Sequence, residues 1–222
     1  MKKYKAVIFD LDGVIISTDN QHYLAWLEVC TNHNIHFDKQ INNLLRGVSR
    51  TESLEIILHN AKRVFNQVEK DDILTEKNNF YVDSLSTLSE KSLSEDVKYT
   101  LSKLKENNIL IAIGSSSKNA KIILQNLNII DLFDAVSDGN NITKSKPDPE
   151  VFLIAAQMLG LKPAECLVVE DAHAGIEAAY NGKMDSVGIN DAYTSKLATY
   201  QIKRLSEILK IIIVVLMCNL YY

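Results

Sequence analysis

The sequence predicts an α/β fold with a doubly wound parallel sheet, on two observations. Continuous apolar runs of strand length recur along the chain, and amphipathic helical patterns lie between most of them. Runs without polar alternation are typical of parallel strands covered on both faces, and alternating strands and helices indicate a doubly wound sheet. The apolar runs are Lys5 to Phe9, Ile109 to Ile113, Ala135 to Val136, Cys166 to Val169 and Ser186 to Ile189.

Three helices are expected between these strands, over residues 94–107, 118–129 and 147–161. In the first, Val97, Leu101 and Leu104 share one face, and Ser94 is placed to cap the amino end. The third has Pro149 near its first turn and ends at Gly160. Each pattern provides one apolar face for the sheet.

The alternation stops between about residues 17 and 88, where the sequence indicates helices only. One helix is expected from about Asn20 to Asn32, and others near Lys39, Thr51 and Asp71. An all-helical insertion directly after the first strand predicts a cap over the carboxyl edge of the sheet, where open α/β folds bind ligands. We therefore expect an α/β catalytic core of residues 1–16 and 89–222 and a helical cap of residues 17–88.

Composition narrows the class of protein. The chain has 222 residues, of which 46% are hydrophobic and 23% charged, values typical of a folded globular protein. Its net charge of -4 gives no broad positive field for a nucleic acid partner. Cys30, Cys166 and Cys218 lie far apart, which argues against a disulfide framework or a zinc site. With no export signal at the amino end, these features favour the cytoplasm.

The carboxyl end, "ILKIIIVVLMCNLYY", has an apolar stretch from Ile211 to Met217. A membrane-spanning helix needs about 20 apolar residues, so this stretch is too short to span a bilayer. We expect a buried terminal strand or helix, or a tail that packs against the core or a partner, and no membrane anchor.

Two pairs of acidic residues follow predicted strands. Asp10 and Asp12 come after the first strand, with Gly13 placed to turn the chain, and Glu170 and Asp171 come after the strand "CLVV". Since parallel strands end at the same edge of a sheet, the four acids should meet there. An oxygen-rich ligand set without histidine or cysteine suits Mg²⁺. The alternative is two unrelated loops whose acids cap helices.

Two further segments could bind phosphate. Ser115, Ser116, Ser117, Lys118 and Asn119 lie between a strand and a helix, where hydroxyl groups and free backbone N–H groups could hold an anion. Lys146 precedes another helix and offers a point charge for phosphate oxygens. Alone, the first could be simple helix capping and the second a solvated lysine.

The segments "DLDGV", "GSSSKN", "KSKP" and "VVEDAHAGIEAA" have the order and spacing of the haloacid dehalogenase superfamily, which the chain resembles over nearly its whole length. The resemblance implies that Asp10 is a nucleophile that becomes an aspartyl phosphate and that Asp12 is the general acid and base. It also implies Mg²⁺ held by Asp10, the Asp12 backbone carbonyl, Glu170 and Asp171, with Ser115 and Lys146 completing the charge balance. One departure is "YNGKM", where the family usually has its glycine one residue later.

The segments "TDNQHYLAW", "LLRGVSRTESL" and "EKNNFYV" resemble the β-phosphoglucomutase branch of this superfamily. That branch interconverts β-D-glucose 1-phosphate and glucose 6-phosphate through glucose 1,6-bisphosphate, and therefore needs a second phosphate site. The resemblance assigns that site to Arg50 with Ser117, Lys118 and Asn119, places Ser116 among the substrate-binding residues, and assigns the sugar contact to Gly47 and Val48. It links Thr18, His22 and Lys77 to cap closure and to positioning Asp12.

Simpler roles are open for several of these residues. Trp26 could line the sugar pocket or only pack within the cap, His22 could be an ordinary histidine on a helix, and Lys77 could lie on a solvated face. Arg50 could only lead into a helix.

Three functions follow from these patterns. We expect a β-phosphoglucomutase, an isomerase, whose partner is a small sugar phosphate and which is a monomer without a membrane or nucleic acid partner. One alternative is a phosphatase of the same fold acting on a small sugar phosphate, which needs no second phosphate site. The other is a non-catalytic protein that binds sugar phosphates.

Overall fold

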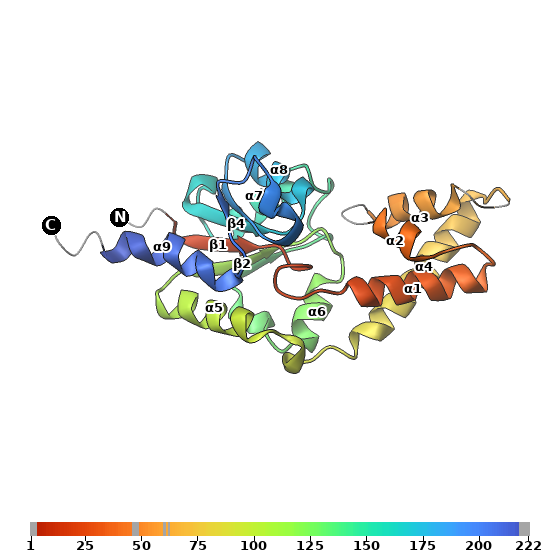
Figure 1. Ribbon diagram of the computed structural model, residues 1–222, viewed down its shortest axis with the longest axis horizontal. Helices are drawn as coiled ribbons and strands as arrows, with labels where there is room; N and C mark the ends of the chain where they lie inside the picture. Colours follow the sequence, from red (N-terminus) through yellow and green to blue (C-terminus); the bar gives the residue numbers. More distant parts are fainter. Residues whose placement is uncertain (1–3, 46–48, 60, 62, 218–222) are drawn as a thin grey trace. The chain divides into compact units, whose positions relative to one another are not determined.

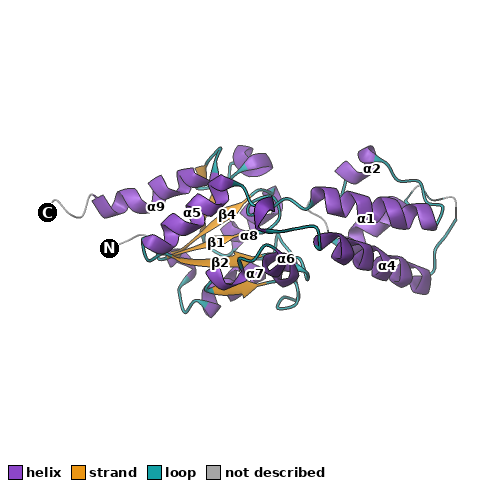
Figure 2. Ribbon diagram, turned by 90° about the horizontal axis from the view of Figure 1, so that it is seen from below, coloured by secondary structure: helices purple, strands orange, loops and turns teal. Residues whose placement is uncertain are grey.

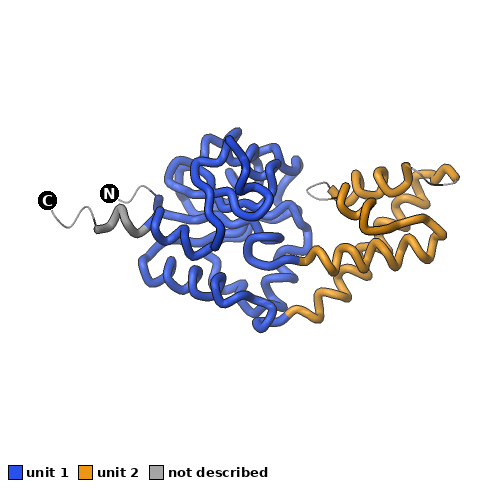
Figure 3. The backbone as a smooth tube through the Cα atoms, viewed as in Figure 1, with its two compact units in different colours: residues 1–17, 89–222 blue, residues 18–88 orange. Residues whose placement is uncertain are grey.

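The chain divides into two compact units, residues 1–17 with 89–222 and residues 18–88, shown in Figure 3. The structure is a computed structural model that describes residues 4–45, 49–59, 61 and 63–217. The first unit is called the core unit below, and the second the cap unit. Ser17, expected at the start of the cap, lies in the core unit.

A six-stranded parallel sheet forms the centre of the core unit (Figure 1). Its strands run in the order β3-β2-β1-β4-β5-β6. Ala6 on β1 is paired with Leu110 on β2 and Cys166 on β4, and Phe9 is paired with Ile113 and Val169. This register places the carboxyl ends of β1, β2 and β4 side by side. The strands are β1 Ala6–Phe9, β2 Leu110–Gly114, β3 Ala135–Ser137, β4 Cys166–Glu170, β5 Asp185–Gly188 and β6 Tyr200–Gln201.

Helices cover both faces of this sheet, so the predicted doubly wound α/β fold is confirmed (Figures 1 and 2). Alternate strand residues point to opposite faces. Ala6 and Ile8 pack with Phe152 of α7 and Ala178 of α8 on one face, and α5 contacts β2 from the other side. The helices of this unit are α5 Glu95–Glu106, α6 Ala120–Asn126, α7 Glu150–Met158, α8 His173–Asn181 and α9 Ile208–Met217.

The predicted start of α5 at Ser94 and its predicted apolar face are also confirmed. The Ser94 hydroxyl accepts a hydrogen bond from the Val97 backbone N–H at 3.2 Å, as expected of an N-cap. Leu101 and Leu104 are fully buried on the predicted face of α5. Lys183 adopts a left-handed φ of 55° after α8, at the position where the family usually has glycine.

The cap unit is helical, with helices α1 Asp19–Asn32, α2 Lys39–Asn43, α3 Arg50–Leu58 and α4 Gln67–Leu85. α1 packs against α4, and Glu76 of α4 accepts hydrogen bonds from Asn32 at 2.8 Å and pairs with His33 at 2.7 Å. The side chains of Ser49 and Asn66 cap α3 and α4. Trp26 is buried in the apolar core between these helices, with Val29, Ile57 and Ile73.

The apolar carboxyl end forms helix α9, one of the two forms expected. Ile208 and Ile212 are buried, and α9 contacts α5. Among the helices of the described residues, none is long and apolar enough to cross a membrane. Cys30 and Cys166 are buried free thiols, so neither forms a disulfide.

Candidate active site

The first acidic pair lies where β1 ends and the chain turns. Asp10 is 7% exposed, and its backbone N–H donates to the Val169 carbonyl of β4 at 2.9 Å. Gly13 makes the turn with a φ of 88°, which favours glycine. A Cβ atom at Gly13 would overlap the carboxylate of Asp171, so glycine also lets the two acidic loops approach each other.

The second acidic pair lies at the end of the neighbouring strand β4. Glu170 is 1% exposed, and its carboxylate accepts a hydrogen bond from the Ala172 backbone N–H at 2.9 Å. Carboxylate oxygens of Asp10, Glu170 and Asp171 lie within 4.8 Å of one another. The Asp12 carboxylate is outside this group, which leaves its backbone carbonyl as the atom that could join the set.

Lys146 reaches this acidic group from the loop between β3 and α7. Its Nζ donates to Asp10 Oδ1 at 2.5 Å and also to Glu170 Oε1. Burial alone would lower the pKa of Lys146, but the charges of Asp10 and Glu170 together raise it above its ordinary value. The lysine is therefore a charged partner of two buried carboxylates.

The single positive charge of Lys146 does not neutralise the three carboxylates of this group. Burial raises the pKa of Asp10 well above its ordinary value, and the charges of Glu170 and Asp171 raise it further, against the opposing effect of Lys146. Burial, followed by the charges of Glu170 and Asp12, raises the pKa of Asp171 to about 7. A cluster of oxygen ligands that is short of positive charge fits a divalent cation, which would favour the ionised carboxylates.

The serine loop, residues 115–119, follows β2 at the same edge of the sheet. The hydroxyls of Ser115 and Ser117 accept hydrogen bonds from the backbone N–H groups of Ser117 and Asn119, each at 3.2 Å. Two of the N–H groups expected to be free, those of Ser117 and Asn119, are therefore satisfied within the loop. Lys118 is exposed at the end of this loop.

A second loop supports the serine loop from outside. The Gly139 N–H donates to the Ser117 carbonyl at 3.1 Å, and the Asn140 side chain donates to the Lys118 carbonyl at 2.9 Å. Ser116 Oγ is buried and has no hydrogen-bond partner in the part of the chain that the structure describes. A rigid loop with one buried hydroxyl in need of a partner is suited to an oxyanion ligand.

The cap unit has a polar cluster of its own, built on α1 and α4. Lys77 is 2% exposed, and its Nζ donates to Nδ1 of His22 at 2.8 Å. The Tyr81 ring stacks on His22 with 4.1 Å between ring centroids, and its hydroxyl is 3.0 Å from Oγ1 of Thr18. Thr18, His22 and Lys77 are thus brought together, as the resemblance implies, and Lys77 is not on a solvated face.

The contact with Lys77 determines the protonation of His22. An ammonium group has no acceptor atom, so Nδ1 of His22 must accept and its proton must lie on Nε2. Burial lowers the pKa of His22 well below its ordinary value, and the charges of Lys77 and Arg50 lower it further. His22 is therefore a neutral donor within a positively charged part of the cap.

Arg50 is the first residue of α3 and is half-buried. Among the described residues, no carboxylate lies within ion-pair distance of its guanidinium group. Trp26 packs in the cap core, with Nζ of Lys77 5.3 Å from its ring centroid. The predicted sugar contacts Gly47 and Val48 lie outside the described residues.

Tyr81 is a member of the cap cluster that the sequence reasoning missed. Its signal is the spacing of the buried residues of α4, namely Ile73, Lys77, Tyr81 and Leu85, which repeat every fourth residue. A lysine inside such an apolar stripe indicates a buried charge with specific partners, and the next residue of the stripe is the expected partner.

The comparison with known proteins agrees with this geometry. Residues 4–182 match the family model described as haloacid dehalogenase-like hydrolase. The chain belongs to this family. Members use a divalent metal, and the group of Asp10, Glu170 and Asp171 fits one.

Relatives within the family include both mutases and phosphatases. A β-phosphoglucomutase of Bacillus subtilis is 41% identical over 92% of this chain and 91% of its own length. A β-phosphoglucomutase structure from Clostridium difficile has a TM-score of 0.85 and 37% identity, covering 98% of both chains. A fructose-1-phosphate phosphatase of Escherichia coli is 31% identical over 85% of this chain and 97% of its own.

The close approach of the acidic loops predicts that Gly13→Ala weakens metal binding. The new Cβ would displace the Asp171 carboxylate, and we expect the affinity for Mg²⁺ or Mn²⁺ to fall by about 10-fold or more, measured by isothermal titration calorimetry. Gly160→Ala is the control, because Gly160 also has a positive φ, 67°, but no atom lies within 4 Å of its added Cβ. Equal metal affinity in the two variants would contradict this role of Gly13.

The neutral state of His22 predicts that the cap loses stability in mild acid. Below about pH 6.5 the unfolded chain binds a proton at His22 that the folded cap, with its lowered pKa, does not. The free energy of unfolding should therefore fall as the pH drops from 7 to 5, by up to ~1.4 kcal/mol per pH unit from this group.

Trp26 is the single tryptophan of the chain and lies in the cap core, so its fluorescence during urea unfolding reports on the cap. His22→Asn, which keeps an acceptor for Lys77, should flatten the pH dependence. An unchanged slope in this variant would show that His22 is not its source.

Proposed function

We propose that this protein is a β-phosphoglucomutase that interconverts β-D-glucose 1-phosphate and glucose 6-phosphate and uses Mg²⁺. The observation that carries the proposal is Arg50, a half-buried guanidinium whose charge acts on His22 and which has no carboxylate partner in the described part of the chain. A mutase must bind the phosphate that is not being transferred, and an arginine fork suits a phosphate group. The 41% identity to a β-phosphoglucomutase over 92% of the chain supports the same proposal.

In the proposed reaction Asp10 is the nucleophile and Asp12 the general acid and base. The phosphoryl group of phosphorylated Asp10 passes to a hydroxyl oxygen of the sugar phosphate, the bond from phosphorus to Asp10 breaks, and Asp12 takes the hydroxyl proton. The bisphosphate then presents its other phosphate. Asp10 attacks that phosphorus, and Asp12 returns the proton to the departing sugar oxygen.

The remaining groups of the core unit balance charge around the transferred group. Lys146, already bound to Asp10 and Glu170, donates to phosphate oxygens, and Ser115 and Ser116 supply hydroxyl groups. Mg²⁺, held by Asp10, Glu170, Asp171 and the Asp12 carbonyl, would reduce the negative charge that a carboxylate nucleophile meets at a phosphate dianion.

The cap residues have supporting roles in this proposal. Lys77 and Tyr81 hold His22 neutral, so that its Nε2–H is a donor, and Thr18 is fixed by the Tyr81 hydroxyl. We assign these residues to positioning Asp12 and the sugar. Ser117, Lys118 and Asn119 are proposed to join Arg50 in binding the second phosphate.

A coupled assay tests the proposal. Purified protein with Mg²⁺, β-glucose 1-phosphate and a trace of glucose 1,6-bisphosphate should produce glucose 6-phosphate, detected by a glucose-6-phosphate dehydrogenase. Release of inorganic phosphate without glucose 6-phosphate would instead support the phosphatase, the activity named for the fructose-1-phosphate phosphatase relative.

The variant Arg50→Ala further distinguishes a mutase from a phosphatase. It should reduce mutase turnover by about 100-fold or more, because a phosphate ligand is lost, and should change hydrolysis of an aryl phosphate, which has no second phosphate, by less than about threefold. Arg63→Ala is the matched control, since Arg63 lies in the same unit but pairs with Glu69 at 2.7 Å. Equal losses on both substrates would mean that Arg50 has a structural role.

A further inference from the structure

The loop between β3 and α7 places Lys146 in the acidic group, and the loop itself has no regular secondary structure between 138 and 149. A lysine that must bridge Asp10 and Glu170 needs a loop whose backbone is fixed. Glu150, the first residue of α7, is the group that holds it.

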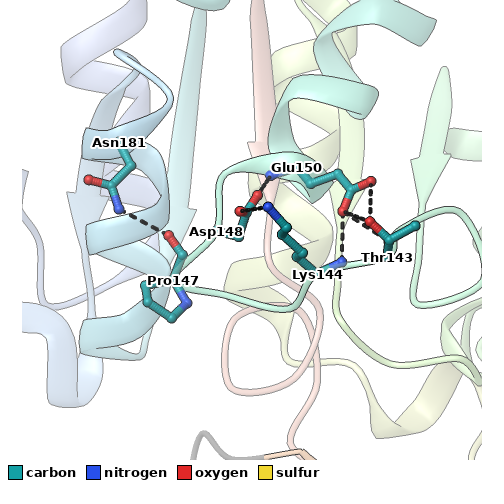
Figure 4. Close-up of polar contacts among 6 residues, drawn as sticks. All are labelled: Thr143, Lys144, Pro147, Asp148, Glu150 and Asn181. Carbon is teal, nitrogen blue, oxygen red and sulfur yellow. Dashed lines mark hydrogen bonds and ion pairs between the residues drawn. The ribbon is translucent and has the colours of Figure 1, made fainter.

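The Glu150 carboxylate binds the start of the lysine loop, residues 143–150, as shown in Figure 4. Its Oε2 accepts hydrogen bonds from the backbone N–H groups of Thr143 at 2.9 Å and Lys144 at 2.7 Å, and the Thr143 hydroxyl donates to the same carboxylate at 3.0 Å. Because the carboxylate belongs to the last residue of the loop, these bonds close it into a ring. Lys146 lies within that ring.

Two further contacts fix the far side of the ring (Figure 4). Asp148 Oδ1 accepts from the Glu150 backbone N–H at 3.0 Å. The Asn181 side chain of α8 donates to the carbonyl of Pro147 at 3.1 Å, directly after Lys146. The loop is thus attached to the first residue of α7 and the last residue of α8, both of which pack on the sheet.

Glu150 itself is not part of the acidic group. In the described part of the chain its carboxylate contacts the backbone and hydroxyl of Thr143 and the backbone of Lys144. It is also absent from the group of acids that could share a metal ion. Any effect of Glu150 on phosphoryl transfer must therefore pass through the loop.

We propose that Glu150 is a positioning residue for Lys146, with Asn181 as a second attachment. The inference rests on the proposed aspartyl-phosphate chemistry at Asp10, and does not depend on which sugar phosphate is used. Because small displacements of a catalytic group cost large factors in rate, loss of the ring should slow phosphoryl transfer without changing the acids themselves.

The experiment measures phosphorylation of Asp10 by acetyl phosphate with Mg²⁺, in which the phosphoryl group moves to the Asp10 carboxylate and acetate leaves. Labelling is followed by mass spectrometry, and Asp10→Asn identifies the site. Glu150→Ala should lower the labelling rate constant by about 10-fold or more. Glu150→Gln, which keeps one acceptor oxygen, should retain a rate within about threefold of the unchanged protein.

Glu95→Ala is the matched control. Glu95 is also the first residue of a helix in the core unit, but among the described residues its carboxylate pairs only with Lys98 of its own helix, at 3.0 Å. Its replacement should leave the labelling rate unchanged. A loss in Glu95→Ala equal to that in Glu150→Ala would overturn the proposal.

A double-variant comparison separates positioning from a general structural effect. If Glu150 acts through Lys146, then Glu150→Ala should cause less than about twofold further loss in a Lys146→Ala background. The same 10-fold loss in both backgrounds, or no loss in Glu150→Ala alone, would overturn the proposal. Asn181→Ala should show the same dependence on Lys146, to a smaller extent.

A second measurement applies if Lys146→Ala does not fold. In ¹⁵N-lysine-labelled protein the ammonium signal of Lys146, assigned by its loss in Lys146→Arg, should broaden or shift in Glu150→Ala and stay unchanged in Glu95→Ala. An unchanged Lys146 signal in Glu150→Ala would overturn the proposal. Labelling of Asp10 without mutase turnover would contradict the proposed function but leave this inference intact.

Discussion

The electrostatic balance between Lys146 and the buried carboxylates is the interaction on which the site depends. Asp10 and Glu170 are almost fully buried, where unpaired charges would be costly. Lys146 pairs with both, but three carboxylates lie within 4.8 Å of one another, and burial raises the pKa of Asp10 and Asp171, so the cluster fits a further cation. The site therefore has a fixed positive charge and a place for a metal ion, which together suit it to a phosphate dianion.

Strand register, glycines and hydrogen bonds hold the loops around this site at fixed positions. The parallel register brings the ends of β1, β2 and β4 together. Gly13 allows the acidic loops to approach, and the absence of a side chain at Gly175 leaves space for the Glu170 carboxylate. Glu150 closes the lysine loop, and Gly139 and Asn140 support the serine loop. The lysine loop and the serine loop are irregular, and each is fixed by hydrogen bonds to a neighbouring element.

The sequence predicted the fold, and the meeting of Asp10, Glu170 and Asp171 at one edge of the sheet, because their signals are local. An apolar run followed by acids marks a strand end, and Ser94 marks a helix start. The missed features leave no repeating pattern in the sequence. β6 has only two residues, so it leaves no periodic pattern. Two N–H groups of the serine loop, those of Ser117 and Asn119, bond to the hydroxyls of Ser115 and Ser117 through a backbone conformation that composition does not specify.

The cap cluster surrounds a buried lysine with polar and aromatic groups. The described partners of Lys77 are the lone pair of a neutral histidine and the faces of two aromatic rings, with its Nζ 4.7 Å from the Tyr81 centroid and 5.3 Å from that of Trp26. Burial, followed by the charges of Lys77 and Arg50, lowers the pKa of His22, whereas the core site gathers three carboxylates. The acid-rich cluster of the core therefore suits a divalent cation, whereas the two cations that act on the buried histidine of the cap favour its neutral form.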